Sequence, residues 1–312
     1  PPPDLAAEAL RVREQLRTAE ALERAGQYAQ GLPLAEFAAS EARRLAYAPV
    51  RAEALLRLGM LRQWSGDYAG AEAALSDAMV LATARKYEDI AARAALELVF
   101  LVGYQLSRYG EARVWWRVAS AAAERTGHAE EYLPQLWNHW GAAQEVHGEH
   151  AAAREAYSEA LAGWEARLGP DHPEAAPTLN NLALIELRLG RSEDALAHHQ
   201  RALAIRERAY GPTHPEVANS LNSLGTALLT IGRPAEARGY LERALAIYEG
   251  MARPEYARAA AALGNLASVR LAEADLPGAV AAQSRAVTML VAARGADDPG
   301  VARARYNLGV AL

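Results

Sequence analysis

Histidines have the widest chemical range of the side chains here, because a neutral imidazole binds metals and titrates near neutral pH. The eight histidines include the adjacent pair His198 and His199, and the pair His147 and His150 that straddles Gly148. None lies in the His-Glu-x-x-His pattern that places two imidazoles on one helical face. The chain has no cysteine and no Gly-x-Ser-x-Gly motif, so a thiolate or serine nucleophile has no candidate. We expect no catalytic residue, no metal and no cofactor in this segment.

Two further histidines stand in matching loops. His172 and His214 each precede a proline that opens a helical pattern. We expect their rings to cap or pack on the helix that follows.

Charge and hydropathy exclude several partners. The chain carries 33 basic and 38 acidic residues, a net charge of −5, with the two signs interspersed. Nucleic acid or an anionic membrane would favour a basic field, which is absent, so RNA binding is disfavoured. No run of about 18 apolar residues exists to span a bilayer. The start, Pro1 to Asp4, lacks the features of a signal peptide, and residues 1–3 look like the end of a proline-rich linker. We expect a cytoplasmic protein.

A short turn recurs seven times along the chain, and it indicates where the two helices of each hairpin meet. Its first residue is Gly26, Gly66, Ser107, Gly148, Gly190, Gly232 and Ala274. An alanine follows each of these positions by twelve residues: Ala38, Ala78, Ala119, Ala160, Ala202, Ala244 and Ala286. Another small residue precedes each alanine by seven: Gly31, Ala71, Ala112, Ala153, Ala195, Ala237 and Ala279. Small residues at a fixed phase of a 40- to 42-residue period predict stacked helical hairpins.

Residues 214–250 illustrate one such hairpin. Pro215 begins a helical pattern that Gly232 ends, and Pro234 begins a second one. The product is an antiparallel helix pair closed by a short turn.

These features resemble the tetratricopeptide repeat (TPR) family. In its pattern a small residue precedes the turn by seven, and Phe100 is the one departure among Gly59, Phe100, Gly141, Ala183, Gly225, Ala267 and Gly309. Residues 168–174, 179–183 and 201–207, repeated at 210–218 and 221–225, resemble the 42-residue variety found in kinesin light chains and bacterial signalling proteins. The resemblance implies an all-α, right-handed α-solenoid of about seven hairpins plus a terminal helix. The expected repeats are 4–46, 47–86, 87–127, 128–169, 170–211, 212–252 and 253–295, followed by a helix at 298–312.

The third repeat carries a second likeness. Residues 94–104 and 111–116 resemble the TPR region that follows the catalytic domain in bacterial, notably myxobacterial-type, serine/threonine protein kinases. No kinase motif lies in this segment itself. The likeness implies the regulatory region of a signalling kinase whose catalytic part precedes Pro1.

In TPR arrays the first helices of the hairpins line a concave groove, and the resemblance assigns slots to it. The groove-facing amide and polar residues are then Asn138, His139, Asn180, Asn181, Asn222, Ser223, Asn265 and Asn307, with Tyr306 beside the last. Neighbouring slots hold Gln63, Trp64, Tyr104, Glu145 and Arg188. An amide offers donors and an acceptor, which suits an extended peptide backbone. The alternative is that these asparagines bond to the adjacent hairpin.

The groove is expected to change character along its length. The second and third repeats offer Glu53, Leu56, Arg57 and Glu97 where later repeats offer asparagine. One end is thus amide-lined, and the other is mixed and more apolar.

The tryptophans fall into two groups according to their positions within the repeat. Trp116, Trp137 and Trp140 fall at large core positions, and we expect them to pack in the interior. Trp64 and Trp115 fit the core phase less well and are candidates for a groove or interface.

Two functions follow from this pattern. The first is a protein-interaction module that binds a peptide or partner domain in its groove. The alternative is a ligand- or signal-peptide-sensing switch that controls an attached effector. We also expect self-association through the unfinished terminal repeat, because an uncapped apolar face tends to pair with a copy of itself.

Overall fold

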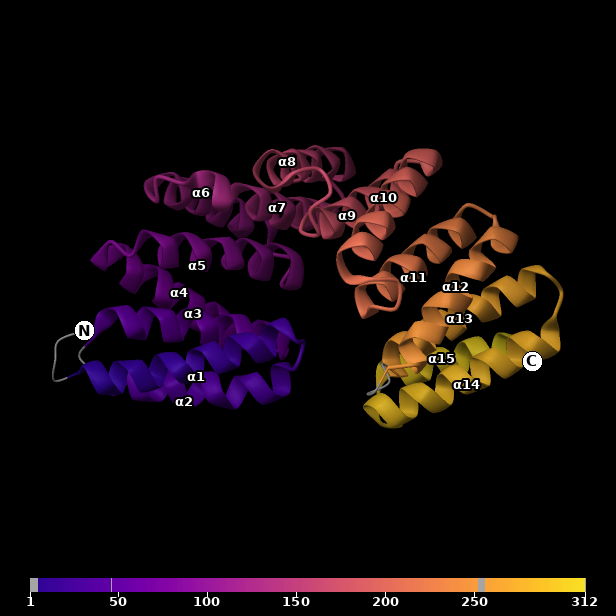
Figure 1. Cartoon of the computed structure of the whole chain (residues 1–312), viewed down its shortest axis with the longest axis horizontal. Coiled ribbons are helices and arrows are strands. Elements are labelled where there is room, and N and C mark those ends of the chain that lie inside the picture. Colours follow the sequence, from indigo (N-terminus) through magenta and orange to yellow (C-terminus); the bar gives the residue numbers. More distant parts are fainter. Residues whose placement is uncertain (1–4, 46, 252–255, 312) are drawn as a thin grey trace. The chain divides into compact units, whose positions relative to one another are not determined.

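Helix-forming residues fill the segments between the turns, and the part of the chain that the structure describes folds accordingly into helices joined by turns. A computed structural model describes residues 5–45, 47–251 and 256–311 (Figure 1). These ranges contain fifteen α-helices, one π-helical turn and one short 3₁₀ helix. The predicted linker at residues 1–3 and the end of the chain at Leu312 lie outside the described residues. No described helix is long and apolar enough to cross a membrane.

The chain divides into two compact units, residues 1–167 and 168–312. Unit 1 contains α1 (Ala6–Arg24), α2 (Tyr28–Arg44), α3 (Ala48–Trp64), α4 (Tyr68–Arg85), α5 (Glu88–Phe100), η1 (Leu101–Gln105), α6 (Tyr109–Arg125), η2 (Ala129–Glu131), α7 (Leu133–His147) and α8 (His150–Leu168), whose last residue falls at the boundary. Unit 2 contains α9 (Ala175–Arg188), α10 (Ser192–Tyr210), α11 (Pro215–Thr230), α12 (Pro234–Glu249), α13 (Tyr256–Ala272), α14 (Leu276–Arg294) and α15 (Pro299–Ala311).

Within each unit, every hairpin packs mainly on its neighbours. Consecutive helices contact one another, and so do the first helices of adjacent hairpins, such as α1 with α3, α3 with α5 and α11 with α13. The core is therefore a series of layers between hairpins, as a repeat array requires. The all-α architecture of paired hairpins, predicted from the period, is confirmed. The exact repeat bounds stay predictions.

The recurring alanines lie where helices approach closely. Each of the seven alanines that follow the turns is at most 1% exposed. The first helices contribute glycine at corresponding contacts: a Cβ on Gly59 would lie 2.6 Å from Leu75 Cγ, and one on Gly225 would lie 2.6 Å from the Leu241 side chain. Small residues are thus needed because the helices leave no room for a larger side chain.

In the third repeat, a π-helical turn follows Phe100, the residue that departs from the repeat pattern. α5 ends at Phe100, and η1 continues it with wider hydrogen bonding, including Leu106 N–H to the Leu101 carbonyl at 2.9 Å. A Cβ on Gly103 would lie 2.5 Å from Ala143 Cβ and 2.9 Å from Ala112 Cβ. Gly103 thus makes a close contact of its own with α6 and α7, and the Phe100 ring lies among the aromatic residues described below.

The turns use the left-handed backbone region. Gly66 has φ +85°, whereas Ser107 and Ala274 occupy the equivalent turns with φ +54° and +60°. Asp67 and Asp275 cap the following helices by accepting from Gly70 N–H and Gly278 N–H. Lys86, the one lysine of the chain, ends α4 in the left-handed conformation and is exposed.

Candidate functional site

In unit 1, the predicted groove residues lie at three successive first-helix positions. Gln63 and Trp64 end α3, Tyr104 lies in η1, and α7 carries Asn138, His139 and Glu145. Trp64 and Tyr104 are 44% and 40% exposed, so their rings reach the surface. Gln63 and His139 are buried, and His139 Nδ1 lies 3.2 Å from the Leu96 carbonyl. Burial lowers the pKa of His139 to about 4, so this ring is neutral at physiological pH.

An aromatic ladder links these positions. The ring centroids of Tyr28 and Trp64 are 5.7 Å apart and nearly parallel, and Trp64 lies 5.9 Å from Phe100. Phe100 then stacks on Tyr104 at 5.0 Å and lies 4.9 Å from His139. Aromatic pairs at these spacings stabilise the contact beyond simple burial. The ladder thereby holds Trp64 and Tyr104 in fixed orientations at the surface.

In unit 2, the predicted asparagines lie on successive first helices: Asn180 and Asn181 with Arg188 on α9, Asn222 with Ser223 on α11, Asn265 on α13, and Asn307 on α15. Asn265 Nδ2 donates to Asn222 Oδ1 at 3.1 Å and to Thr226 Oγ1 at 2.9 Å. These bonds join adjacent first helices. They are of the kind described by the alternative given above, in which the asparagines bond to the adjacent hairpin. Asn180 Oδ1 lies 2.9 Å from His199 Nδ1. Asn307 is exposed.

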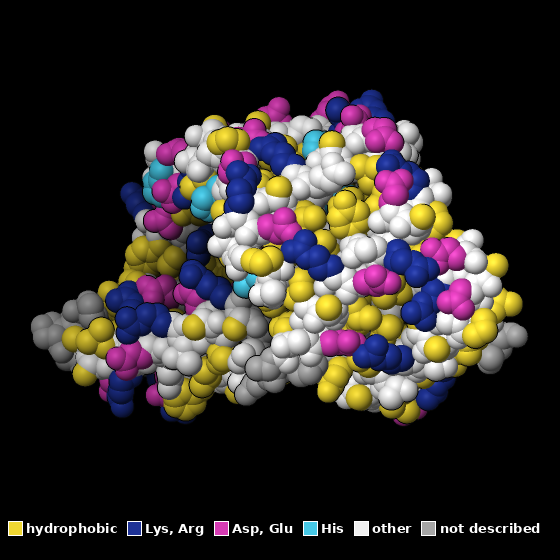
Figure 2. Space-filling model, turned by 45° about the vertical axis from the view of Figure 1, so that its right-hand side comes forward, with side chains coloured by type: hydrophobic (Ala, Val, Ile, Leu, Met, Phe, Trp, Pro, Cys, Tyr) yellow, Lys and Arg dark blue, Asp and Glu magenta, His cyan; other side chains and the backbone are white. Residues whose placement is uncertain are grey.

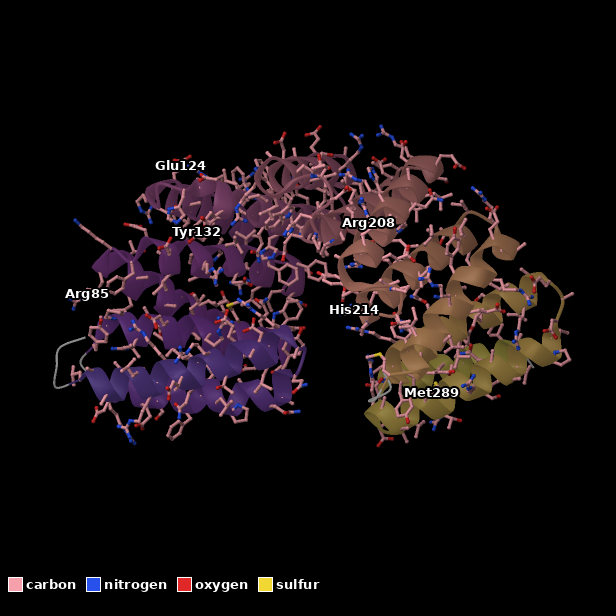
Figure 3. All side chains as sticks on the ribbon, in the orientation of Figure 1. Arg85, Glu124, Tyr132, Arg208, His214 and Met289 are labelled. Atoms are coloured by element: carbon pink, nitrogen blue, oxygen red, sulfur yellow. The ribbon has the colours of Figure 1, made fainter. Side chains whose placement is uncertain are left out.

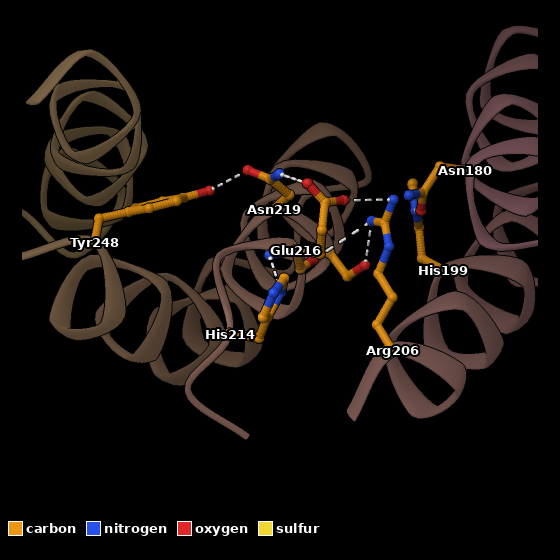
Figure 4. A network of polar contacts seen from close by, with 8 residues as sticks. Asn180, His199, Arg206, His214, Glu216, Asn219 and Tyr248 are labelled. Carbon is orange, nitrogen blue, oxygen red and sulfur yellow. Dashed lines mark hydrogen bonds and ion pairs between the residues drawn. The ribbon is translucent and has the colours of Figure 1, made fainter. Parts of the chain in front are cut away.

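A second polar network in unit 2 is buried between repeats (Figure 4). Arg206 of α10 forms an ion pair with Glu216 of α11 at 2.9 Å and donates to Ser220 Oγ at 2.8 Å. Asn219 Nδ2 donates to Glu216 Oε1, and Tyr248 of α12 donates to Asn219 Oδ1 at 2.7 Å. Burial lowers the pKa of Arg206, which still carries its charge against Glu216. The sequence motif contained Arg206 but did not reveal its partner on the next hairpin. The network fixes one hairpin against the next rather than facing a ligand.

A groove of unit 1 crosses α1, α3 and α5. Its volume is about 480 Å³, and its lining is Leu10, Arg13, Leu16, Arg17, Glu20, Glu53, Leu56, Arg57, Asp89, Ile90, Arg93 and Tyr132. Tyr132 precedes α7 and is labelled in Figure 3. We call this the mixed groove. Glu53, Leu56 and Arg57 were predicted for it. These three residues lie on α3, and the lining residues of α1 and α5 were missed. On α1, the slots two and three positions before Ala19 would have selected Leu16 and Arg17.

Ion pairs hold much of the charge in the mixed groove. Arg13 forms a two-pronged contact with Glu53, at 2.9 and 2.7 Å. Arg57 contacts Glu20 at 3.0 Å and Glu23 at 2.5 Å. These bonds run between α1 and α3, so they join the first two hairpins. A bidentate arginine–carboxylate pair is directional, and it keeps the walls of the groove in place.

A buried carboxyl lies on α5, the third helix of this groove. Glu97 is 7% exposed, and burial raises its pKa to about 7, against the opposing effects of Gln63, Arg93 and Arg57. Burial also raises the pKa of Glu23, although Arg57 opposes it. The carboxyls here lie close to arginines but have been removed from water, and desolvation decides the direction of both shifts.

The remaining histidines and tryptophans have structural contacts. His214 Nδ1 accepts from Glu216 N–H and caps α11, as predicted. His172 Nδ1 accepts from Glu174 N–H in the turn before α9, and the N-cap of α9 has no side-chain capping bond. Trp116, Trp137 and Trp140 pack in or against the core of unit 1, which confirms their predicted role. Trp115 is half-buried against the same core. Among the described residues no group of three or more His, Cys, Asp or Glu could hold a metal ion.

Comparisons with known proteins found one family model and several solved structures that are similar to this chain. The family model "Tetratricopeptide repeat" matches residues 132–207 and 174–250. Among solved structures, the apo form of RapI is 12% identical, with 96% of this chain and 81% of that chain covered and a TM-score of 0.66. A Rap protein complexed with competence and sporulation factor is 17% identical, with 95% and 80% covered and a TM-score of 0.59. BtubC (BKLC) from P. vanneervenii is 26% identical, with 88% and 93% covered and a TM-score of 0.49. The search of curated proteins finds no match.

Tandem helix pairs that bury their apolar faces only between neighbours define a helical-repeat scaffold. The tetratricopeptide repeat model matches residues 132–207 and 174–250, and the helix pairs on either side of this part are consistent with the same repeat fold.

Proposed function

We propose that this array binds a peptide segment of a partner protein along its first helices, with the mixed groove of unit 1 as the main recognition surface. The observation that carries the proposal is the groove itself, a 480 Å³ depression with apolar and charged walls that crosses three first helices. Pockets of this size with a few fixed polar groups are typical binding sites. Inter-helix ion pairs hold its walls, so little ordering is needed when a partner binds.

The asparagine residues of unit 2 support the same function. Asn222 and Asn265 face one another across adjacent first helices and form a rung of amides. An amide that already bonds its neighbour retains further donor and acceptor capacity. In unit 2, the proposed backbone contacts of a bound chain are Asn180, Asn181, Asn222, Ser223, Asn265 and Asn307, with Arg188 as a side-chain contact. In unit 1, Asn138 is a proposed backbone contact, and Trp64, Tyr104 and Glu145 are proposed side-chain contacts. Gln63 and His139 are proposed to support the surface from beneath, because they are buried.

The test uses two exposed apolar residues of unit 1. Leu10 lines the mixed groove and is 57% exposed, whereas Val80 lies on α4 outside it and is 65% exposed. Peptides selected from a random displayed library are titrated against Leu10→Asp and Val80→Asp. We expect Leu10→Asp alone to weaken binding. Equal binding by both variants would place the peptide elsewhere and overturn the role of the groove.

Thermal melting separates this function from the sensing alternative. A ligand that binds only the folded state raises the melting midpoint. If a small molecule raises it while no peptide or protein binds, a ligand-controlled switch replaces the interaction scaffold.

We propose further that the array is the regulatory region of a bacterial signalling kinase. The support is the likeness of residues 94–104 and 111–116 to the repeats that follow such catalytic domains. The coding sequence upstream of Pro1 tests it directly: a glycine-rich loop, a catalytic His-Arg-Asp and an Asp-Phe-Gly motif are expected there. An upstream region without these motifs would remove the kinase.

A further inference from the structure

The first helix α13 differs from the earlier first helices of unit 2 at one slot of the repeat. Ten residues before the turn, α9 carries Asn180 and α11 carries Asn222, whereas α13 carries Gly264. Ala257 and Ala261 lie on the same face of α13 as Gly264, at helical spacing from it. α11 packs on α13, but α15 packs on α14 without a comparable contact with α13 among the described helices. The small side chains and the missing contact leave a space between α13 and α15.

This space is a pocket of about 350 Å³ that is formed by α13, α14 and α15. We call it the α13–α15 pocket, and its three helices are the last ones of the chain in Figure 1. Its polar lining residues are Asn265, Ser268, Gln283, Arg294, Arg303 and Asn307. A water molecule takes up about 30 Å³ in the liquid, so the pocket has room for roughly twelve waters. Its size therefore suits a small molecule.

Gln283 of α14 supplies a hydrogen-bond acceptor to this pocket. Nine residues after the turn, where Gln283 stands, other second helices have buried apolar residues such as Leu75 and Leu241. Gln283 is 4% exposed, and its Nε2 donates to the Ala304 carbonyl at 3.1 Å. Its Oε1 has no hydrogen-bond partner among the described residues, and a Cβ on Gly264 would lie 3.9 Å from this oxygen. An acceptor without a partner on so buried a residue is costly, and a donor on a ligand would satisfy it.

The charged residues that line the α13–α15 pocket are both arginines. Arg303 is exposed and has no ion-pair partner among the described residues. Arg294 lies 3.8 Å from Asp298, near the limit of an ion pair, and its side chain is 52% exposed. Asp298 also accepts from Gly300 N–H at 2.7 Å.

This local balance differs from that of the whole chain. Acidic residues outnumber basic ones by 38 to 33, and Figure 2 shows both signs interspersed over the visible face. No acidic side chain belongs to the described lining of the pocket. A guanidinium group forms directional, charge-assisted hydrogen bonds with a carboxylate or a phosphate. The pocket therefore favours an anionic ligand.

We propose that the α13–α15 pocket binds a small polar anion, a molecule that carries a carboxylate or phosphate group together with a separate hydroxyl or N–H group. The anionic group pairs with Arg303 and Arg294, and the second group donates to Gln283 Oε1. Asn265 of α13 and Asn307 of α15 offer further amide contacts. The site lies within unit 2, so it does not depend on the mixed groove of unit 1.

The experiment compares anions with neutral counterparts on the full chain by ligand-observed NMR titration. Gluconate and glucose 6-phosphate are matched with glucose, and N-acetylglycine is matched with N-acetylglycinamide. We expect at least one anion to bind about tenfold more tightly than its counterpart, because a charge-assisted hydrogen bond is lost in the neutral molecule. Whether the carboxylates or the phosphate bind more tightly identifies the anionic group that the pocket selects.

Variants then locate the site. Arg303→Ala is compared with Arg305→Ala, because both arginines are exposed on α15 and Arg305 lies outside the pocket. We expect Arg303→Ala to lower the affinity by about tenfold and Arg305→Ala to leave it unchanged. Gly264→Asn restores the residue of α9 and α11, fills the space, and should abolish binding. Gln283→Leu restores the residue of α12, removes the acceptor, and should also weaken binding.

Melting temperatures separate lost binding from lost folding. Arg303→Ala is expected to melt like the parent, because its side chain is exposed. The inference is overturned if no anion binds, if anions and neutral counterparts bind equally, or if Arg303→Ala and Arg305→Ala have the same effect. Leu10→Asp should leave anion binding unchanged, so failure of this site and failure of peptide binding in the mixed groove are separate results.

Discussion

At the scale of single residues, burial decides the titration of His199. Its side chain is 1% exposed, Nδ1 lies 2.9 Å from Asn180 Oδ1, and Nε2 has no hydrogen-bond partner among the described residues. Burial lowers its pKa to about 4, with a further contribution from His198. In the unfolded chain a histidine titrates near 6.5. The unfolded state therefore binds more protons between pH 4 and 6.5, and folding is weakened as the pH falls through this window.

We predict that His199→Gln removes this part of the acid destabilisation. The full effect of the pKa difference is about 3 kcal/mol between pH 7 and 4, as an upper bound. Urea denaturation at several pH values measures it, as the change in unfolding free energy of the transition that reports on unit 2. His147→Gln, at an exposed histidine, is the control and should retain the slope. An unchanged slope in His199→Gln would show that this ring is protonated or solvated in the folded state.

Two turns carry a side chain where the other repeats have glycine. Ser107 and Ala274 have φ +54° and +60°, a conformation that costs a residue with a Cβ roughly 1 kcal/mol or more. We predict that Ala274→Gly and Ser107→Gly raise the free energy of unfolding by up to about 1 kcal/mol, because strain is relieved while the unfolded chain gains some freedom. Gly66→Ala is the reverse experiment and should destabilise. The prediction fails if both glycine variants melt earlier than the parent.

At the scale of elements, the π-helical turn η1 is the most specific feature. It follows a phenylalanine at the position where six other repeats have glycine or alanine, and Gly103 within it packs closely on Ala112 and Ala143. Phe100 itself lies beside Trp64, Tyr104 and His139. The surface aromatics of unit 1 therefore lie beside this π-helical turn.

We predict that Gly103→Val destabilises unit 1 by about 2 kcal/mol or more, since the added atoms overlap two methyl groups within a packed core. Gly239→Ala, at an exposed helical glycine of α12 with open space around it, should instead stabilise by about 0.5–1 kcal/mol. Thermal and urea denaturation measure both. Intrinsic tryptophan fluorescence, to which six residues contribute, is expected to change in Gly103→Val and not in Gly239→Ala.

At the scale of the whole molecule, the last helix presents apolar side chains to solvent. Tyr306 and Val310 of α15 are 73% and 66% exposed. We predict concentration-dependent self-association through this face, measured by light scattering, and its loss in Tyr306→Ser/Val310→Ser. The double variant should melt like the parent, because neither side chain is buried. A parent chain that stays monomeric at all concentrations would contradict the prediction.

Much of the architecture follows from the sequence because a repeat array is governed by local rules. The period placed the turns, the alanines predicted the close contacts, and the positions of His172, His214 and Trp140 followed from phase. The ion-pair partners of charged residues could not be predicted from the sequence. Arg206 and Arg57 reach across to another hairpin, and such a contact depends on side-chain length and rotamer rather than on spacing along the chain. The π-helical hydrogen bonding at η1 could not be predicted for a related reason. The spacing of residues along the chain does not reveal which carbonyl accepts from each N–H.

The position of Lys86 has a practical consequence. This lysine ends α4 and is exposed, whereas the mixed groove is formed by α1, α3 and α5. Amine-directed chemistry would therefore place a dye at one side chain, outside the recognition surface, and at the α-amino group of the chain. Because both lie in unit 1, polarisation or energy transfer from that dye to a labelled peptide could follow binding without introducing a cysteine.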